Sequence, residues 1–116
     1  MKIFIICPVR NVEPEIKEKI ENYVRILEFL GHEVYYPPRD TDQNDSVGFR
    51  ICMSNKEGIL WANEVHVAWD EKSEGFLFDG GMAFMAGKKV RIIEGIFPEA
   101  TVGKSFASMV RYWAKQ

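Results

Sequence analysis

The feature that most constrains the fold is a regular alternation of short apolar runs with segments that have helical spacing. The apolar runs are typical of strands buried on both faces and cover residues 2–7, 32–36, 64–69 and 89–94. After each run, apolar residues recur every three or four positions, which predicts helices over about 12–30, 45–62, 73–87 and 106–113. Alternating strands and helices form right-handed crossovers, so the sequence predicts a parallel sheet with helices on both faces.

Length and charge fit one ordinary globular domain. The chain has 116 residues, and we assign all of them, 1–116, to a single domain. A net charge of −2 argues against nucleic-acid binding, which normally needs a basic face. No segment approaches the roughly 18 apolar residues of a membrane span, and the first apolar run is too short for a signal peptide. We therefore expect a cytoplasmic protein without nucleic-acid or membrane partners.

The cysteines and histidines give no sign of a metal site or of nucleophilic catalysis. Cys7 and Cys52 lie far apart without a CxxC partner, so neither zinc nor a redox pair is indicated. The chain has only two histidines, too few to argue a Ser-His-Asp or Cys-His arrangement. His66 falls in the middle of a strand, which favours a core histidine over a catalyst.

Three loops are expected to meet at one edge of the sheet. In open parallel sheets, ligands bind beyond the carboxyl ends of the strands, near a change in strand order. The segments that follow three of the expected strands are 7–11, 37–44 and 70–79. This rim is therefore the expected site.

Asp79, in the segment SEGFLFDGGMAFMAGKK, has two interpretations that the residues alone leave open. An acid near the start of a helix interacts favourably with the helix dipole, worth about 0.3–1 kcal/mol. Its neighbours Phe76, Phe78 and Met82 are apolar, however, and a carboxylate in an apolar pocket suits nucleophilic or acid–base chemistry.

The turn before this helix and the loop after the first strand offer possible anion ligands. Ser73 and Gly75 lie where backbone N–H groups can hold an anion, although Ser73 is equally suited to an ordinary helix cap. Arg10 is either a surface arginine or a phosphate ligand, because the planar guanidinium group of arginine matches the geometry of phosphate. No GxGxxG or GxxxxGK[ST] motif is present, so neither a dinucleotide fold nor a P-loop is supported.

Asn55 stands in the middle of an apolar stripe formed by Val47, Ile51, Ile59 and Ala62. A buried amide needs hydrogen-bond partners, so Asn55 either braces a neighbouring loop or faces the site.

The loop YYPPRDTDQND carries Asp40 and Asp42 and lies on the expected rim. Charged loops are usually just solvated, but two prolines stiffen this one, and its place on the rim fits contacts with a sugar or base.

The chain resembles the nucleoside 2-deoxyribosyltransferase family, which includes the 2'-deoxynucleoside 5'-monophosphate N-glycosidases. ANEVHVAWD reads as a third strand, and SEGFLFDGGMAFMAGKK then resembles the family's S-x-G-T-x-x-E-I-G-Y-A-x-A-x-G-K segment. The resemblance covers nearly the whole chain and is most specific from Asn63 to Lys88.

This resemblance implies a flavodoxin-like (Rossmann-like) three-layer α/β sandwich with a parallel sheet of four to five strands. It implies a small nucleoside or nucleotide substrate, no metal or organic cofactor, and a homodimer or higher homo-oligomer. The family's chemistry is retaining glycosyl transfer, in which a glutamate attacks C1' of a 2-deoxyribosyl group and water or a new base resolves the intermediate.

The residue correspondences implied by the resemblance include three departures. The nucleophile falls on Asp79, which is one methylene shorter than glutamate. The acid that assists the leaving base falls on Asn55, which cannot give a proton, and the orienting tyrosine of the first strand falls on Phe4. The proton for the leaving base would then come from Asp40, Asp42 or Asp70, or no residue would supply it and the site would bind without turnover.

Other positions match the monophosphate-hydrolysing branch. Ser73 and Gly75 match its serine and glycine, and Arg10, in a loop that begins at Pro8, matches an arginine near the phosphate. Ser108, in SFASMVR, matches a helix start that completes a neighbouring subunit's site.

Two functions of different classes follow. The first is an enzyme that cleaves or exchanges the N-glycosidic bond of a 2'-deoxynucleoside or its 5'-monophosphate. The alternative is a catalytically degenerate nucleotide-binding module, a sensor or regulatory subunit. A plain flavodoxin-like scaffold is a third possibility; flavin binding is disfavoured because PVRNVEPE lacks a serine- and threonine-rich phosphate cradle.

Overall fold

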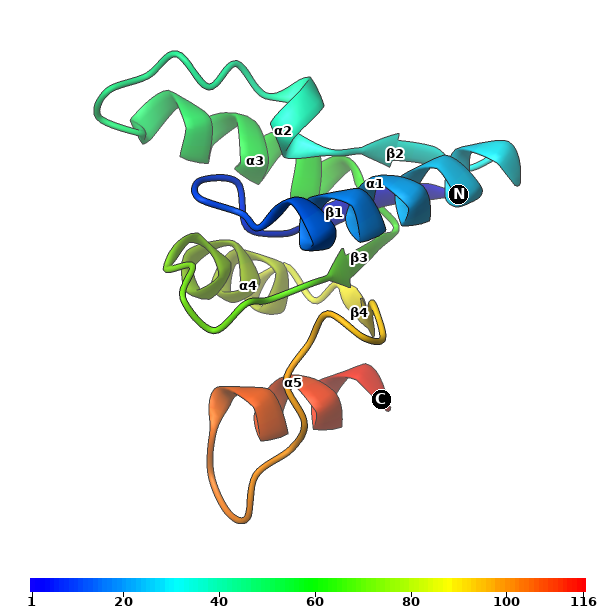
Figure 1. Ribbon diagram of the computed structural model, residues 1–116, viewed down its shortest axis with the longest axis vertical. Helices are drawn as coiled ribbons and strands as arrows, with labels where there is room; N and C mark the ends of the chain where they lie inside the picture. Colours follow the sequence, from blue (N-terminus) through cyan, green and yellow to red (C-terminus); the bar gives the residue numbers. More distant parts are fainter.

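A four-stranded parallel sheet forms the centre of the molecule in the computed structural model, which describes all residues 1–116. The strand order is β2-β1-β3-β4, with neighbouring strands parallel throughout. Helices cover both faces of the sheet (Figure 1). In chain order the elements are β1 (Lys2–Ile6), α1 (Pro14–Phe29), β2 (Glu33–Tyr35), α2 (Pro37–Asp40), α3 (Phe49–Trp61), β3 (Glu64–Val67), α4 (Gly75–Met85), β4 (Lys89–Ile92) and α5 (Phe106–Ala114).

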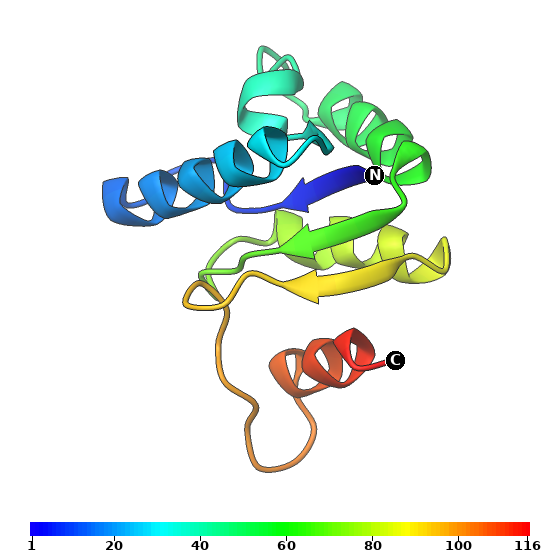
Figure 2. The ribbon, with the colours of Figure 1, turned by 90° about the vertical axis from the view of Figure 1, so that its right-hand side faces the viewer.

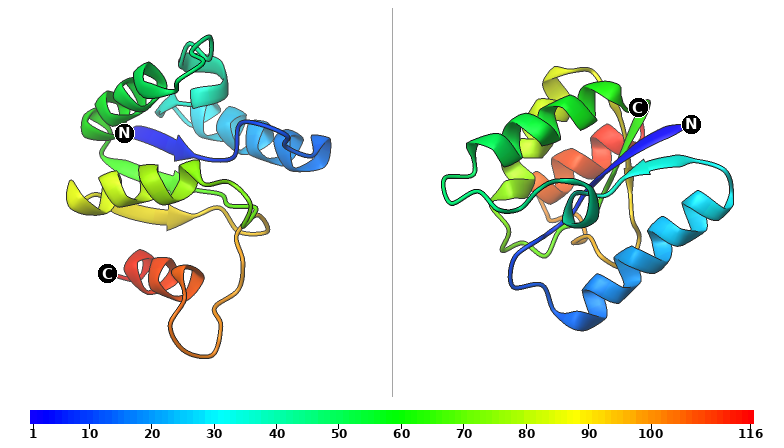
Figure 3. Two further views of the ribbon diagram at one scale, coloured as in Figure 1. Left: turned by 90° about the vertical axis from the view of Figure 1, so that its left-hand side faces the viewer. Right: turned by 90° about the horizontal axis from the view of Figure 1, so that it is seen from above.

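The two faces of β1 build two separate cores. Side chains of successive strand residues point to opposite faces, so Ile3 and Ile5 pack with the α1 side, whereas Phe4 and Ile6 pack with α3 and α4. Figures 2 and 3 show α1 on one face of the sheet and α3 and α4 on the other. The expected α/β fold, with helices on both faces of a parallel sheet, is confirmed.

The last helix lies beyond the edge of the sheet. After β4 the chain makes a long loop and returns as α5, next to the β4 edge (Figure 2). The indole of Trp113 donates a hydrogen bond to the carbonyl of Lys88, and its ring meets Phe84 of α4 edge-on at 5.2 Å. The sheet therefore has four strands, the lower of the two numbers expected. None of the helices combines the length and apolar character needed to cross a bilayer.

A short helix, α2, occupies the segment that the sequence indicated as a loop. Proline fits the first turn of a helix because the backbone N–H groups there have no intrahelical partner. Pro37 opens α2, and the carboxylate of Asp40 accepts the backbone N–H of Tyr36 at 2.8 Å, which closes the turn. The two prolines that suggested a loop thus start a helix.

Aspartates placed before α3 and α4 delay the start of both helices. The Asp45 carboxylate accepts the N–H groups of Val47, Arg50 and Ile51, and α3 begins at Phe49, a few residues later than the expected start near residue 45. In the same way, Asp70 holds a turn before α4, which begins at Gly75 rather than at Ser73.

Gly58 of α3 marks the closest approach of a helix to the sheet. A Cβ atom at this position would lie 2.8 Å from two ring carbons of Phe4, whose side chain is fully buried. We expect Gly58→Ala to lower the free energy of unfolding by about 1–3 kcal/mol, because the ring has no free space to move into. Urea denaturation measures this effect. Gly81→Ala is the matched control, since a Cβ there meets nothing within 4 Å, and an equal loss in both variants would contradict this explanation.

Candidate active site

Asp79 is the fifth residue of α4 and faces α3. Its carboxylate is half-buried and accepts a hydrogen bond at 3.3 Å from the side-chain amide of Asn55, which is itself buried. Burial raises the pKa of Asp79 from 3.8 to about 6, and the hydrogen bond from Asn55 offsets only part of this effect. No arginine, lysine or histidine pairs with the carboxylate.

Two cysteine thiols share the surroundings of Asp79. Burial, together with the negative charge of Asp79, raises the pKa of Cys7 to about 12 and raises that of Cys52 as well. Both thiols are therefore protonated and neutral at ordinary pH. Above pH 6, Asp79 is thus a carboxylate among apolar and neutral groups, a condition that leaves it nucleophilic.

The raised pKa of Asp79 has a consequence for stability. A carboxyl group whose pKa is higher in the folded than in the unfolded chain adds stability below its unfolded pKa, and this contribution is lost as the pH rises through about 6. We expect Asp79→Asn to be more stable than the wild type at pH 8 by about 1–2 kcal/mol. The difference should disappear near pH 3.5 in urea denaturation. Equal stabilities at both pH values would contradict the raised pKa.

Asn55 combines both roles that its position in the apolar stripe suggested. Its Nδ2 group donates to Asp79, and its Oδ1 accepts the hydroxyl of Thr41 at 3.0 Å. Thr41 follows α2, so Asn55 braces this neighbouring segment and faces the carboxylate at the same time. Thr41 and Tyr35, whose hydroxyl lies 2.7 Å from that of Thr41, were not identified from the sequence.

The turn before α4 presents several unused hydrogen-bond donors. The Asp70 carboxylate accepts the N–H groups of Lys72 and Ser73, and the Ser73 carbonyl accepts the indole N–H of Trp69. The backbone N–H groups of residues 74–76 make no hydrogen bond within the chain, and neither does the Ser73 hydroxyl. The start of α4 thus has the donors that an anion requires.

The loop after β1 leaves Arg10 free. Pro8 is buried, whereas Arg10 is exposed and makes no ion pair or hydrogen bond. Asn11, the next residue, has a left-handed backbone with φ of 55°.

Asp40 and Phe4 both make well-defined contacts within the chain. Burial opposes the charge of Asp40, but hydrogen bonds from Arg39 and from the backbone of Tyr36 outweigh it and lower the pKa of Asp40. Its carboxylate thus holds α2, and a contact with a substrate stays a prediction. Phe4 is fully buried and stacks on Tyr35 with ring centres 5.2 Å apart; its role at the site stays a prediction.

The side chains of Asp42 and Ser108 form hydrogen bonds within their own segments. Asp42 is exposed and accepts the backbone N–H of Asn44, which stabilises its own turn. The hydroxyl of Ser108, at the start of α5, accepts the N–H of Thr101 and bonds with Ser105. Its role in a neighbouring subunit's site stays a prediction.

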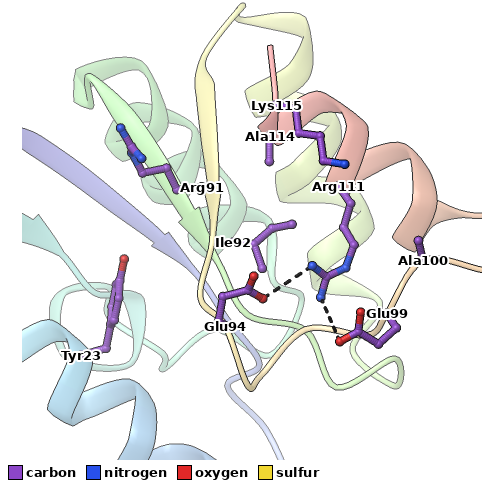
Figure 4. A pocket seen from close by; sticks show the side chains of 9 residues that line it. All are labelled: Tyr23, Arg91, Ile92, Glu94, Glu99, Ala100, Arg111, Ala114 and Lys115. Atoms are coloured by element: carbon purple, nitrogen blue, oxygen red, sulfur yellow. Dashed lines mark ion pairs between the residues drawn. The ribbon is translucent and has the colours of Figure 1, made fainter.

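An open surface cavity of about 620 Å³ contains none of the expected site residues. It opens between α1, β4 and α5, where Arg111 bridges Glu94 and Glu99 at 3.5 and 4.0 Å (Figure 4). The residues that line it are Tyr23, Arg91, Ile92, Glu94, Glu99, Ala100, Arg111, Ala114 and Lys115. Its charged groups are paired or exposed to solvent, so we place the candidate site at Asp79.

A buried polar cluster lies beside this cavity. Burial lowers the pKa of His66, which therefore stays neutral; its Nε2 bonds to Glu64 at 3.0 Å and its Nδ1 to the hydroxyl of Tyr23. Arg91 donates a further hydrogen bond to Glu64 at 3.0 Å. The structure thus places His66 in the core, with its hydrogen bonds satisfied.

No protein-family model and no curated protein matches the chain, but solved structures do. A 2-deoxyribosyltransferase from the psychrotolerant bacterium Bacillus psychrosaccharolyticus aligns with a TM-score of 0.65 and 23% identity, over 79% of this chain and 71% of that one. A CMP N-glycosidase of Clostridium botulinum aligns with a TM-score of 0.59 and 18% identity, over 79% and 70%. The chain has the fold of these two enzymes. The family resemblance seen in the sequence is thereby confirmed at the level of the fold.

Proposed function

We propose that the chain cleaves or exchanges the N-glycosidic bond of a 2'-deoxynucleoside or its 5'-monophosphate, with Asp79 as the nucleophile. The observation that carries this proposal is the half-buried, unpaired carboxylate of Asp79, whose pKa is raised to about 6, in a chain with the fold of a deoxyribosyltransferase and an N-glycosidase. An acid that only solvated the surface would keep its ordinary pKa.

The reaction needs two displacements at one carbon atom. In the first, an Asp79 oxygen bonds to C1', the bond from C1' to the base nitrogen breaks, and the base leaves with the electron pair and takes a proton from water. In the second, water or another base attacks C1' and releases the carboxylate. Asn55 holds the carboxylate by its N–H group, but it has no acidic proton to give the leaving base.

The start of α4 would hold the 5' end of the substrate. Ser73 offers a free hydroxyl, and residues 74–76 offer free backbone N–H groups; Gly75 adds no side chain that would keep a ligand away. Arg10 is an unpaired cation on the loop after β1. Together these donors suit a 5'-phosphate or a 5'-hydroxyl group.

The test is an incubation of the pure protein with each 2'-deoxynucleoside and each 2'-deoxynucleoside 5'-monophosphate, with and without an acceptor base. Chromatography measures the free base and any exchanged nucleoside. We expect base release from at least one of the compounds. Binding of a nucleotide by calorimetry without turnover of any would contradict the enzyme and favour a nucleotide-binding module, because Asn55 supplies no proton.

We also propose that the chain forms a homodimer or higher homo-oligomer through α4. This 11-residue helix has one charged residue, Asp79, yet it exposes Leu77, Phe78, Phe84 and Met85, the last at 89%. A helix that is apolar on all sides is normally buried. Sedimentation should therefore give at least a dimer, and Met85→Lys should weaken it by about tenfold or more. A wild-type monomer at high concentration would contradict the proposal.

A further inference from the structure

Four side chains from four parts of the fold form one hydrogen-bonded chain that ends at Asp79. The Tyr35 hydroxyl lies 2.7 Å from the Thr41 hydroxyl, Thr41 lies 3.0 Å from Asn55 Oδ1, and Asn55 Nδ2 lies 3.3 Å from Asp79 Oδ2. Thr41 and Asn55 are only 5% and 6% exposed, so water does not compete for the central bond between them. The chain runs from the end of β2, past α2 and across α3, to α4.

The charge of Asp79 sets the direction of every bond in this chain. An ionised carboxylate only accepts hydrogen bonds, so Asn55 must present its NH₂ group and turn Oδ1 toward Thr41. Because Oδ1 is an acceptor, the single hydroxyl proton of Thr41 must point at it. The Tyr35 hydroxyl must then donate to Thr41.

The two ends of the chain are held in place. The ring of Tyr35 stacks on the fully buried Phe4, with an angle of 23° between the ring planes, and also lies close to Gly58. Thr41 is fixed by its backbone N–H, which donates to the carbonyl of Pro37 at 3.0 Å. An amide can rotate by 180° at little steric cost, so the Asn55 side chain needs such a fixed partner to keep one orientation.

We propose that Thr41 and Tyr35 are positioning residues that lock the Asn55 amide with its N–H group toward the Asp79 carboxylate. Their importance for catalysis rests on the proposed function, but the locked amide does not. Without the Thr41 hydroxyl, Oδ1 of Asn55 is a buried acceptor without a donor, and the ionised carboxylate loses its only side-chain hydrogen bond when the amide turns.

The test is the titration of Asp79 in the substrate-free protein, followed by carbon-13 NMR of its side-chain carboxyl group. In Thr41→Val, which keeps the shape and removes the hydroxyl, we expect the titration midpoint to rise by about 1 pH unit. Thr41→Ser should restore the wild-type midpoint. Cys7 and Cys52 are the other titratable groups near the carboxylate; both titrate at higher pH and do not interfere.

Two further variants keep the test decisive. Thr101→Val is the matched control, because Thr101, the only other threonine, lies on the surface beside α5. In this variant the titration midpoint of Asp79 should equal that of the wild type. Tyr35→Phe removes only the hydroxyl at the outer end of the chain and should raise the Asp79 midpoint less than Thr41→Val does. It takes the place of Thr41→Val in the test if that variant does not fold. An unchanged midpoint in a folded Thr41→Val protein, or in Tyr35→Phe where that variant takes its place, would overturn the proposal.

The titration separates this proposal from the proposed function. A raised midpoint in Thr41→Val together with no base release from any substrate would support the positioning role and reject the enzyme. Base release with an unchanged midpoint would support the enzyme and reject the positioning role. For an active protein, the acidic limb of the pH–rate profile should shift with the NMR midpoint.

Discussion

Asp79→Asn should reduce the rate of base release by about a thousandfold or more. Asparagine has nearly the same shape and can still bond to Asn55, but it has no carboxylate to form the ester with C1'. Removal of a group that bonds to the reacting carbon leaves only binding and orientation, so kcat should fall with little change in KM. Initial rates of base release at pH 8 measure the effect.

Glu57→Gln is the matched control for the loss of one carboxylate. Glu57 is an exposed residue of α3, and its replacement should leave the rate within about twofold of the wild type. If Asp79→Asn retained wild-type turnover, Asp79 would not be the nucleophile, even if the chain releases base.

The largest expected loss of stability follows replacement of Glu64, on the opposite face of the sheet. Glu64→Ala should lower the free energy of unfolding by about 3 kcal/mol. The side chains of Glu64 and His66 are 10% and 5% exposed, so removal of the carboxylate leaves the imidazole N–H buried without an acceptor. Arg91 loses its partner as well.

The effect of Glu64 should depend on pH. Burial opposes the charge of Glu64, but hydrogen bonds from His66 and Arg91 outweigh it and lower its pKa. Its stabilising contribution is therefore present above the ordinary pKa and is lost as the pH falls through the lower folded value. Urea denaturation at pH 7 should show the full difference from the wild type, and the difference should shrink in strong acid. A loss at pH 7 no larger than that of Glu57→Ala would contradict the role of this cluster.

The fold was predictable because its strands and its helices each leave a local pattern in the sequence. Buried parallel strands appear as continuous apolar runs, and the helices between them show the spacing of one buried face. The start of each helix was less predictable, since side chains outside the helix set it. Asp45 and Asp70 bind backbone N–H groups before α3 and α4, and Asp40 closes α2 in a segment with two prolines.

Asp79 and Asn55 could be picked out from the sequence as candidate residues, but the hydrogen bonds that extend from them could not. Asp79 stood out as the one acid in an apolar helix and Asn55 as the one amide in an apolar stripe, and the two side chains meet. Thr41 and Tyr35 gave no such signal, because a buried hydroxyl is recognised only when its partner from a distant segment is known. Asp40 was expected to contact a substrate because its segment was read as a loop, whereas its carboxylate accepts hydrogen bonds from Tyr36 and Arg39 of its own turn.

The most direct test of the central claim is to trap the covalent intermediate. A 2'-deoxynucleoside or monophosphate that releases its base is mixed with the protein, the reaction is quenched with acid, and the digested protein is examined by mass spectrometry. We expect a 2-deoxyribosyl group, with its phosphate where the substrate carries one, as an ester on the peptide that contains Asp79. An ester found on another residue would contradict Asp79 as the nucleophile. The same conclusion would follow if the wild type formed no ester and Asp79→Asn released base at the full rate.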